Sequence, residues 1–222
     1  MKNIVKTFLL ATVLAVPHIS LSQQINWRSF SDTERHIINI NTGWDYGLIA
    51  GLGYGYKLNL KLPIVLGIEY SSPFGKDLVD DFKTKIGGQA EVLKMKNFSV
   101  SVKAVGIFRR YQNDLARFAN FGSEFSANFG YYKPRWYIAG EFGFDKAITT
   151  NIMNSEAMKT IYPHVKDGWY VPTGGNFFYG FVSGYSFKSN DLYLKIGKMI
   201  TQDFKTTPTI PFYFQLGFSK KL

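Results

Sequence analysis

Hydrophobic alternation with a period of two is the feature that most constrains this chain. It begins near residue 36 and continues to the C-terminus, in segments of about ten residues that turn-forming residues separate. Helical periodicity is nearly absent. After residue 22 no apolar run approaches the roughly 20 residues that a membrane-spanning helix needs. Any structure that spans a membrane must therefore consist of strands.

The two faces of these expected strands differ in character. One face is apolar and aromatic, as at Phe125 and Phe129, whereas the other carries glycine, serine and single charges, as at Glu124 and Ser126. Small residues suit a narrow lumen, and a continuous aromatic face suits contact with lipid. The pattern favours a transmembrane barrel. A soluble exported β-protein with its apolar face inward is the alternative.

The segments between the expected strands alternate in length. Short separators lie at residues 57–61, 94–97, 133–134 and 188–191, and longer ones lie at 71–85, 111–117, 149–175 and 203–211. Outer-membrane barrels alternate short periplasmic turns with longer outer loops in this way. With a first strand at 36–42, the sequence predicts an all-β, up-and-down antiparallel transmembrane barrel of about ten strands, with eight as the alternative.

Aromatic residues near the short separators are expected to form a girdle at the periplasmic interface. These residues are Tyr54, Tyr56, Tyr131, Tyr132, Trp136, Tyr185 and Phe187. Gly51, Gly53 and Gly55 alternate with the apolar residues of their segment. We expect them to leave space in the lumen for larger side chains from facing strands, such as Lys103 or Tyr193.

The N-terminal residues predict export. Lys2 and Lys6 precede an apolar run at 8–16 and the small residues of 20–22, which is the pattern of a cleaved signal peptide. Cleavage before Gln23 leaves about 200 residues. The chain has no cysteine, so neither a lipid attachment through cysteine nor a disulfide is available. The expected organisation is a signal peptide at 1–22, an N-terminal periplasmic segment at 23–35 and the barrel domain at 36–222.

The chain is basic, with 26 Lys and Arg against 16 Asp and Glu. Removing Lys2 and Lys6 takes the net charge from +10 to +8. An exported basic protein meets anionic outer-membrane lipids and lipopolysaccharide phosphates, so these are the expected partners. No nucleic-acid-binding motif is present, and nucleic acid is not an expected partner.

The last expected strand carries the most specific resemblance. Its apolar face ends at the C-terminal Leu222, and Gln215 and Gly217 lie on the other face. In this pattern the chain resembles integral outer-membrane β-barrel proteins of Gram-negative bacteria. It departs from that pattern at Lys220, where an apolar residue is common, and in ending with Leu rather than Phe. The resemblance implies residence in the outer membrane and recognition of the last strand by the barrel-assembly machinery.

Two groups of polar residues are candidates for function. Residues of both charges are expected to form an ion-paired core in the lumen rather than an open channel; they are Glu69, Glu91, Lys103, Glu124, Glu141 and Lys195. A second group is expected near the outer rim, as a site for an anionic head group. It consists of Arg109, Arg110, Asp145 and Lys146 at the strand tops, with His164 and Trp169 from the longest outer loop.

A membrane-structural or surface-binding role is therefore expected first. A narrow channel is the alternative, in which the lumen charges line water instead of pairing. A hydrolase at the outer rim that uses His164 and Asp167 is less favoured, because only two histidines follow the signal peptide. No catalytic residue is assigned, no His or Glu cluster has metal-ligand spacing, and no cofactor is expected.

Overall fold

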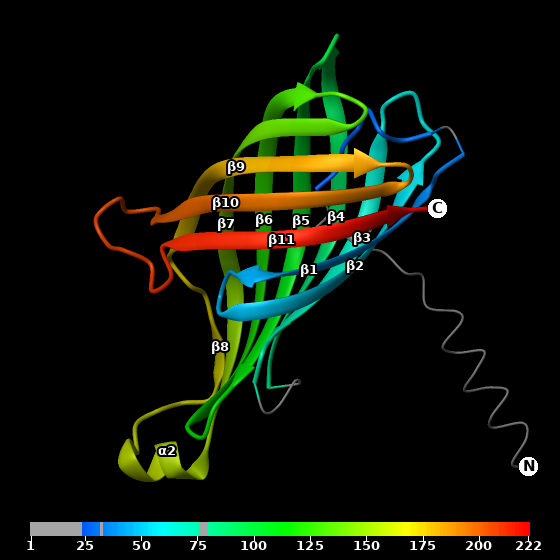
Figure 1. Ribbon diagram of the computed structural model, residues 1–222. Coiled ribbons are helices and arrows are strands. Elements are labelled where there is room, and N and C mark those ends of the chain that lie inside the picture. Colours follow the sequence, from blue (N-terminus) through cyan, green and yellow to red (C-terminus); the bar gives the residue numbers. More distant parts are fainter. Residues whose placement is uncertain (1–23, 32, 76–79) are drawn as a thin grey trace, which may run out of the picture.

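The computed structural model describes residues 24–31, 33–75 and 80–222 (Figure 1). The expected signal peptide at residues 1–22 lies outside the described residues. Among the described residues, the one helix is α2 (Glu156–Ile161), which lies in the longest loop. No helix of this part of the chain is long and apolar enough to cross a membrane.

Ten antiparallel strands form a closed barrel. Each strand pairs with the next one along the chain, and the first strand pairs with the last, so that Ile37 lies opposite Lys221 and Trp44 lies opposite Phe214. Closure leaves no open edge, and backbone N–H and C=O groups on the wall find partners on the neighbouring strand. The predicted all-β, up-and-down topology is confirmed. The strands are β1 (His36–Trp44), β2 (Leu48–Leu58), β3 (Ile64–Pro73), β4 (Asp81–Met95), β5 (Phe98–Gln112), β6 (Ala116–Tyr132), β7 (Trp136–Asn154), β9 (Gly175–Phe187), β10 (Asn190–Thr201) and β11 (Phe212–Lys221).

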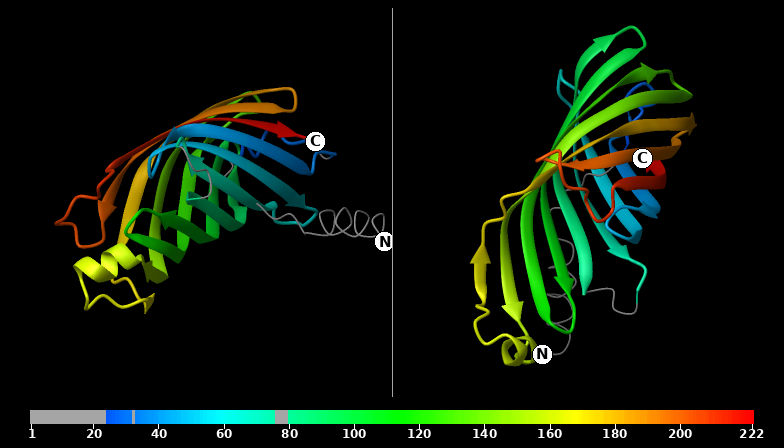
Figure 2. Two further views of the ribbon diagram at one scale, coloured as in Figure 1. Left: turned by 90° about the horizontal axis from the view of Figure 1, so that it is seen from below. Right: turned by 90° about the vertical axis from the view of Figure 1, so that its left-hand side faces the viewer.

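One further strand, β8 (Gly168–Tyr170), pairs with the far end of β7. β7 thus pairs with β9 along Trp136–Lys146 and with β8 at Thr150–Ile152. The two views in Figure 2 show β8 and α2 projecting beyond the barrel, at the end away from the C-terminus. The barrel therefore has a short-turn end, which holds the C-terminus, and a long-loop end.

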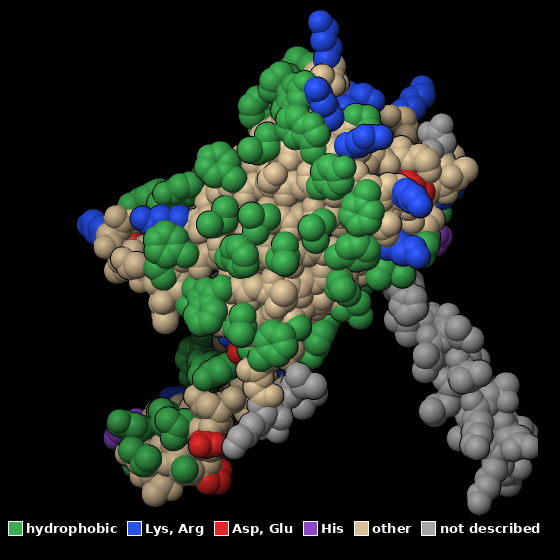
Figure 3. Space-filling model, viewed as in Figure 1, with side chains coloured by type: hydrophobic (Ala, Val, Ile, Leu, Met, Phe, Trp, Pro, Cys, Tyr) green, Lys and Arg blue, Asp and Glu red, His purple; other side chains and the backbone are tan. Residues whose placement is uncertain are grey.

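The apolar face of the strands points outward, as predicted. Large apolar side chains cover the wall in Figure 3, and Phe125 and Phe142 keep 59% and 57% of their surface exposed. The residues that alternate with them, such as Glu124 and Glu141, are buried in the lumen. An outward apolar band around a polar interior is the arrangement that lipid requires of a barrel.

Tyrosines fill much of the lumen by packing over glycines. A Cβ atom added at Gly217 would lie 2.1 Å from the Tyr193 ring, and one at Gly184 would lie 2.3 Å from the Tyr137 ring. Only a residue without a side chain allows such an approach. Gly51 and Gly53 also leave space for larger lumen side chains, but these are not the expected Lys103 or Tyr193. The side chains of Asn41 and Asn39 on the adjacent strand face the two glycines.

Two residues near the strand ends lie on a different face or element from the one expected. Tyr132 is buried in the lumen and stacks on Tyr137 with ring centroids 5.3 Å apart, so it does not belong to the girdle. Strand alternation from Phe129 already places it inward. Lys85 was expected to end an outer loop, but β4 begins at Asp81 and carries Lys85 into the lumen.

Candidate functional site in the lumen

Charged side chains pair across the middle of the lumen. Glu124 on β6 contacts Lys85 on β4 at 2.7 Å and Lys103 on β5 at 2.5 Å. Glu141 on β7 contacts Lys195 on β10 at 2.8 Å and accepts a hydrogen bond from the Tyr213 hydroxyl at 3.1 Å. Because these groups are buried, each charge depends on its partner, and losing one partner of such a pair costs about 3–5 kcal/mol.

The other two acids of the expected core have different partners. Glu69 accepts a hydrogen bond from the Asn41 amide at 3.1 Å, and no ion pair within the described chain reaches it. Glu91 pairs with Arg28 at 2.6 Å and accepts a hydrogen bond from the Ser99 hydroxyl. The structure therefore places all six predicted lumen residues inside the barrel, and it adds Lys85 and Arg28 as cations that the sequence interpretation did not assign.

Residues 24–31, which precede β1, fill the short-turn end of the lumen and are called the plug segment here. Ile25 and Trp27 are buried among lumen side chains of several strands, including Tyr137. The fully buried Asn26 donates hydrogen bonds to the Ser186 hydroxyl at 2.8 Å and to the Lys133 carbonyl at 2.9 Å. This segment lacks the period-two pattern, so the alternation could not predict its position.

Further contacts connect the plug segment to the barrel wall. Arg28 reaches Glu91 on β4 and donates to the Ser99 hydroxyl on β5 at 2.7 Å. Lys221 on the last strand pairs with Asp191 at 3.0 Å and donates to the Ser29 hydroxyl. The described part of the expected periplasmic segment at 23–35 thus lies at the end where the short turns lie.

A cavity of about 520 Å³ opens at the long-loop end. Arg109 on β5 lines it and holds Asp81 with two hydrogen bonds, of 3.1 Å from Nε and 3.0 Å from Nη2. The wall also includes Tyr111 and Phe118, whose ring centroids lie 6.0 Å apart. Polar groups complete the lining at Asn120, Thr150 and Asn176. The mixture of ring faces and hydrogen-bonding groups suits a polar ligand.

The turn between β1 and β2 folds inward beneath this cavity. Asp45 pairs with Lys83 at 2.8 Å, and the Tyr46 ring lies 4.2 Å from Lys83 Nζ and 4.3 Å from Arg109 Cζ. Burial alone would raise the pKa of Asp45, but the charges of Lys83 and Lys85 lower it below its ordinary value. Asp45 and Lys83 were missed by the sequence interpretation, although Lys83 shares the lumen parity of Lys85 and Gln89.

The structure does not bring the six expected rim residues together. Arg109 and Asp145 line the cavity, and Lys146 contributes to its wall. Arg110 lies on the opposite face of β5 from Arg109, 3.8 Å from Asp80. Consecutive strand residues face opposite ways, which places Arg110 on the other side of β5 from Arg109 and outside the cavity.

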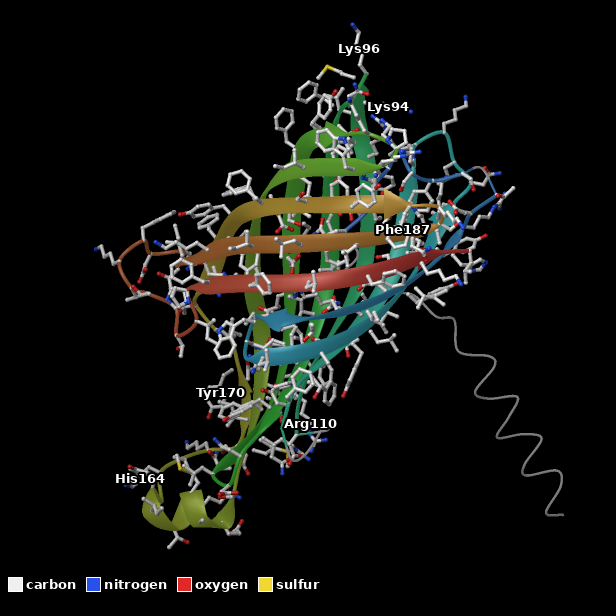
Figure 4. The ribbon with its side chains drawn as sticks, in the orientation of Figure 1. Lys94, Lys96, Arg110, His164, Tyr170 and Phe187 are labelled. Carbon is white, nitrogen blue, oxygen red and sulfur yellow. The ribbon has the colours of Figure 1, made fainter. Side chains whose placement is uncertain are left out.

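His164 and Trp169 lie apart from this cavity. His164 is exposed near α2, well beyond Arg110 and Tyr170 in Figure 4. It makes no hydrogen bond to a carboxylate within the described residues. Trp169 packs on Phe121, on the outer face of the barrel, with ring centroids 6.0 Å apart. In the described part of the chain no group of three His, Cys, Asp or Glu residues could hold a metal ion.

The closed ring of ten strands and its outward apolar band determine the architecture. It is that of an outer-membrane β-barrel. No family model matches the sequence, and no curated protein matches it. Among solved structures, a KdgM porin in complex with disordered oligogalacturonate is similar, with 11% identity, a TM-score of 0.43 and coverage of 84% of this chain and 99% of that one. A second KdgM porin structure has 10% identity, a TM-score of 0.42 and the same coverage.

The lumen of this outer-membrane barrel narrows sharply below the outer cavity. A pocket of only about 40 Å³ remains where Lys85, Glu124 and Lys195 meet. A separate cavity of about 400 Å³ lies at the short-turn end, beside Trp27 and Phe30 of the plug segment. Paired charges and the plug segment lie between the two larger cavities.

Proposed function

We propose that this protein is an integral outer-membrane barrel that does not conduct solutes and binds a ligand at the cell surface. The observation that carries the proposal is the paired filling of the mid-lumen, where Glu124 and Glu141 hold Lys85, Lys103 and Lys195. Ions would have to separate these pairs to pass. Export through cleavage before Gln23 and assembly through the last strand are part of the same proposal.

The proposed ligand site is the outer cavity. Arg109 uses two of its N–H groups on Asp81, and its side chain keeps 32% of its surface exposed, so further donors of the guanidinium are available. The rings of Tyr111 and Phe118 border the same space. The guanidinium donors of Arg109 suit an anionic group, and the two aromatic rings suit an attached sugar or lipid. Lipopolysaccharide combines these features.

A narrow channel is the second candidate, and one observation favours it. The short-turn end is filled by a segment that precedes the barrel strands, not by the wall itself. Such a segment can leave without unpairing a strand. If it does, the mid-lumen ion pairs and the buried lumen tyrosines remain as the barrier.

Conductance in planar bilayers separates the two candidates. The mature protein and the double variant Trp27→Ala with Arg28→Ala are measured side by side. The variant removes the packing of Trp27 and the contacts of Arg28 with Glu91 and Ser99. We expect no stable conductance steps from either, because the ion pairs around Glu124 and Glu141 still fill the mid-lumen. Steps from the double variant alone would support a plugged channel, and steps from both would refute the closed-lumen proposal.

A further inference from the structure

The exposed charged side chains around the short-turn end are basic. In Figure 3, Lys and Arg side chains gather at this end of the visible face. The three acidic side chains nearby, Glu34, Glu91 and Asp191, are buried. No ion pair within the described chain involves any of the nine basic residues here. They are Arg35, Lys57, Lys61, Lys94, Lys96, Lys133, Arg135, Lys188 and Lys220.

The long-loop end has a different balance of charge. Its residues at 45, 80–83, 109–117, 145–167 and 198–205 carry nine basic and eight acidic side chains. Several of these are paired, as Arg109 is with Asp81. The net positive charge of the protein is therefore concentrated at the short-turn end, away from the loops that lipopolysaccharide would meet.

A cavity of about 400 Å³ lies within this basic region. Arg35, Lys57 and Lys94 line it, together with the plug residues Trp27 and Phe30. Lys57 Nζ lies 4.7 Å from the centroid of the Phe30 ring. Glu91, which also lines the cavity, is already paired with Arg28. The other acidic residue of the lining, Glu34, accepts a hydrogen bond from the Ser31 amide at 2.9 Å and forms no ion pair with these cations within the described chain. The three cations thus border a partly open space in which none of them has an ion-pair partner.

Apolar side chains lie among these cations on the same turns. Leu60 is 58% exposed beside Lys61, and Met95 is 53% exposed between Lys94 and Lys96. Exposed apolar residues next to lysines are typical of a surface at the boundary between head groups and acyl chains. A soluble polyanion would be bound by the cations alone, so this combination favours a lipid.

We propose that this cavity binds the phosphate head group of an anionic phospholipid in the periplasmic leaflet. Arg35, Lys57 and Lys94 bind the phosphate, and Leu60 lies against the acyl chains. The proposal rests on the outer-membrane location proposed above and on the short turns facing the periplasm. It does not depend on whether the lumen conducts or on what the outer cavity binds.

Lipid retention by the folded mature protein tests this site. The protein is exchanged into detergent with phosphatidylglycerol or with phosphatidylcholine, and bound lipid is counted by native mass spectrometry. We expect phosphatidylglycerol to be retained preferentially. In the triple variant Arg35→Gln, Lys57→Gln and Lys94→Gln, its affinity should fall by about fivefold for each cation removed.

A variant of equal charge loss is the control. Lys159→Gln, Lys166→Gln and Lys205→Gln remove three cations from the long loops, and phosphatidylglycerol retention should not change. If both triple variants lose phosphatidylglycerol retention equally, net charge alone explains the retention and the proposed site is wrong. Equal retention of the two lipids by the unmodified protein would also overturn the site. Cosedimentation with peptidoglycan that only the first variant loses, without a lipid preference, would assign the cations to a cell-wall polymer instead. If the triple variant does not fold, the single variant Lys94→Gln, at the exposed end of β4, gives the same readout.

Discussion

Two neighbouring arginines on β5 have different surroundings because consecutive strand residues face opposite sides of the barrel wall. Arg109 faces the outer cavity and lies over the Tyr46 ring, whereas Arg110 faces outward and donates to Gln112 at 2.8 Å. The two have the same chemistry and differ in sequence position by one. Only the first can take part in a site inside the barrel mouth.

This difference gives a prediction for the outer cavity. Arg109→Gln should weaken lipopolysaccharide binding to the folded protein by tenfold or more, because a hydrogen bond to a charged group contributes about 1.5–3 kcal/mol. Arg110→Gln removes the same charge from the outer face and should leave the affinity unchanged. Calorimetric titration of both variants checks the prediction, and equal affinities would exclude the cavity as the site.

Strands and loops differ in how far the sequence predicts them. The alternation located the ten barrel strands because a wall between lipid and lumen forces every second residue outward. The alternation also places Tyr132 and Lys85 on the lumen face. The sequence interpretation missed this because it did not extend the alternation to the ends of the strands. The plug segment could not be predicted in this way. Its residues, such as Asn26 and Arg28, are placed by contacts with strands that lie 63 to 160 residues away in sequence.

The loop residues of the expected rim group do not lie at the outer cavity. His164 and Trp169 were grouped with Arg109 because all lie at the long-loop end. Loop length alone does not say where a loop folds, and this one pairs through β8 with the far end of β7. His164 and Trp169 therefore lie at the same end of the barrel as Arg109 without contacting it.

The loop between β10 and β11 offers a prediction about pH. The Thr201 hydroxyl donates to Asp203 at 2.6 Å, and the amides of Lys205 and Thr206 donate to the same carboxylate. These bonds lower the pKa of Asp203 below its ordinary value of 3.8. A lowered folded-state pKa means that the carboxylate helps to order the loop at and above that ordinary value, and that this help is lost as pH falls through the lower, folded-state pKa.

NMR titration of the Asp203 carboxyl carbon from about pH 5 downward measures this effect. The variant Thr201→Val removes the first donor and should move the pKa of Asp203 back toward 3.8. An Asp203 titration that is identical in the two proteins would mean that the loop does not hold these hydrogen bonds in solution.

Closure is the property of the whole molecule, and it depends on tight contacts in the lumen. The pairing of β1 with β11 completes the ring, and Gly217 on β11 is where the Tyr193 ring packs against the backbone. A closed, fully hydrogen-bonded barrel resists detergent until it is heated. Such a protein stays in the membrane through an alkaline wash and migrates differently on a gel before and after boiling.

We expect the mature protein to behave in this way, and Gly217→Val to lose the heat-dependent shift because its side chain would overlap the Tyr193 ring. Gly75→Val is the matched control, since no atom of the described residues lies within 4 Å of a Cβ atom added there. It should keep the shift. Release of the unmodified protein by alkaline washing would contradict the membrane location altogether.

The plug segment competes with any other molecule for the short-turn mouth of the barrel. Residues 32–35 alone separate it from β1, so it is tethered at the mouth that it fills. A short tether gives a segment an effective concentration in the millimolar range. Contacts that would be too weak to hold a free peptide, such as those of Ser29 with Lys221, are then enough to keep the mouth occupied. If the short turns face the periplasm, as proposed, a separate periplasmic protein or peptide must overcome this local excess before it can enter. A molecule that arrives from the cell surface would meet no such tethered segment among the described residues of the outer cavity.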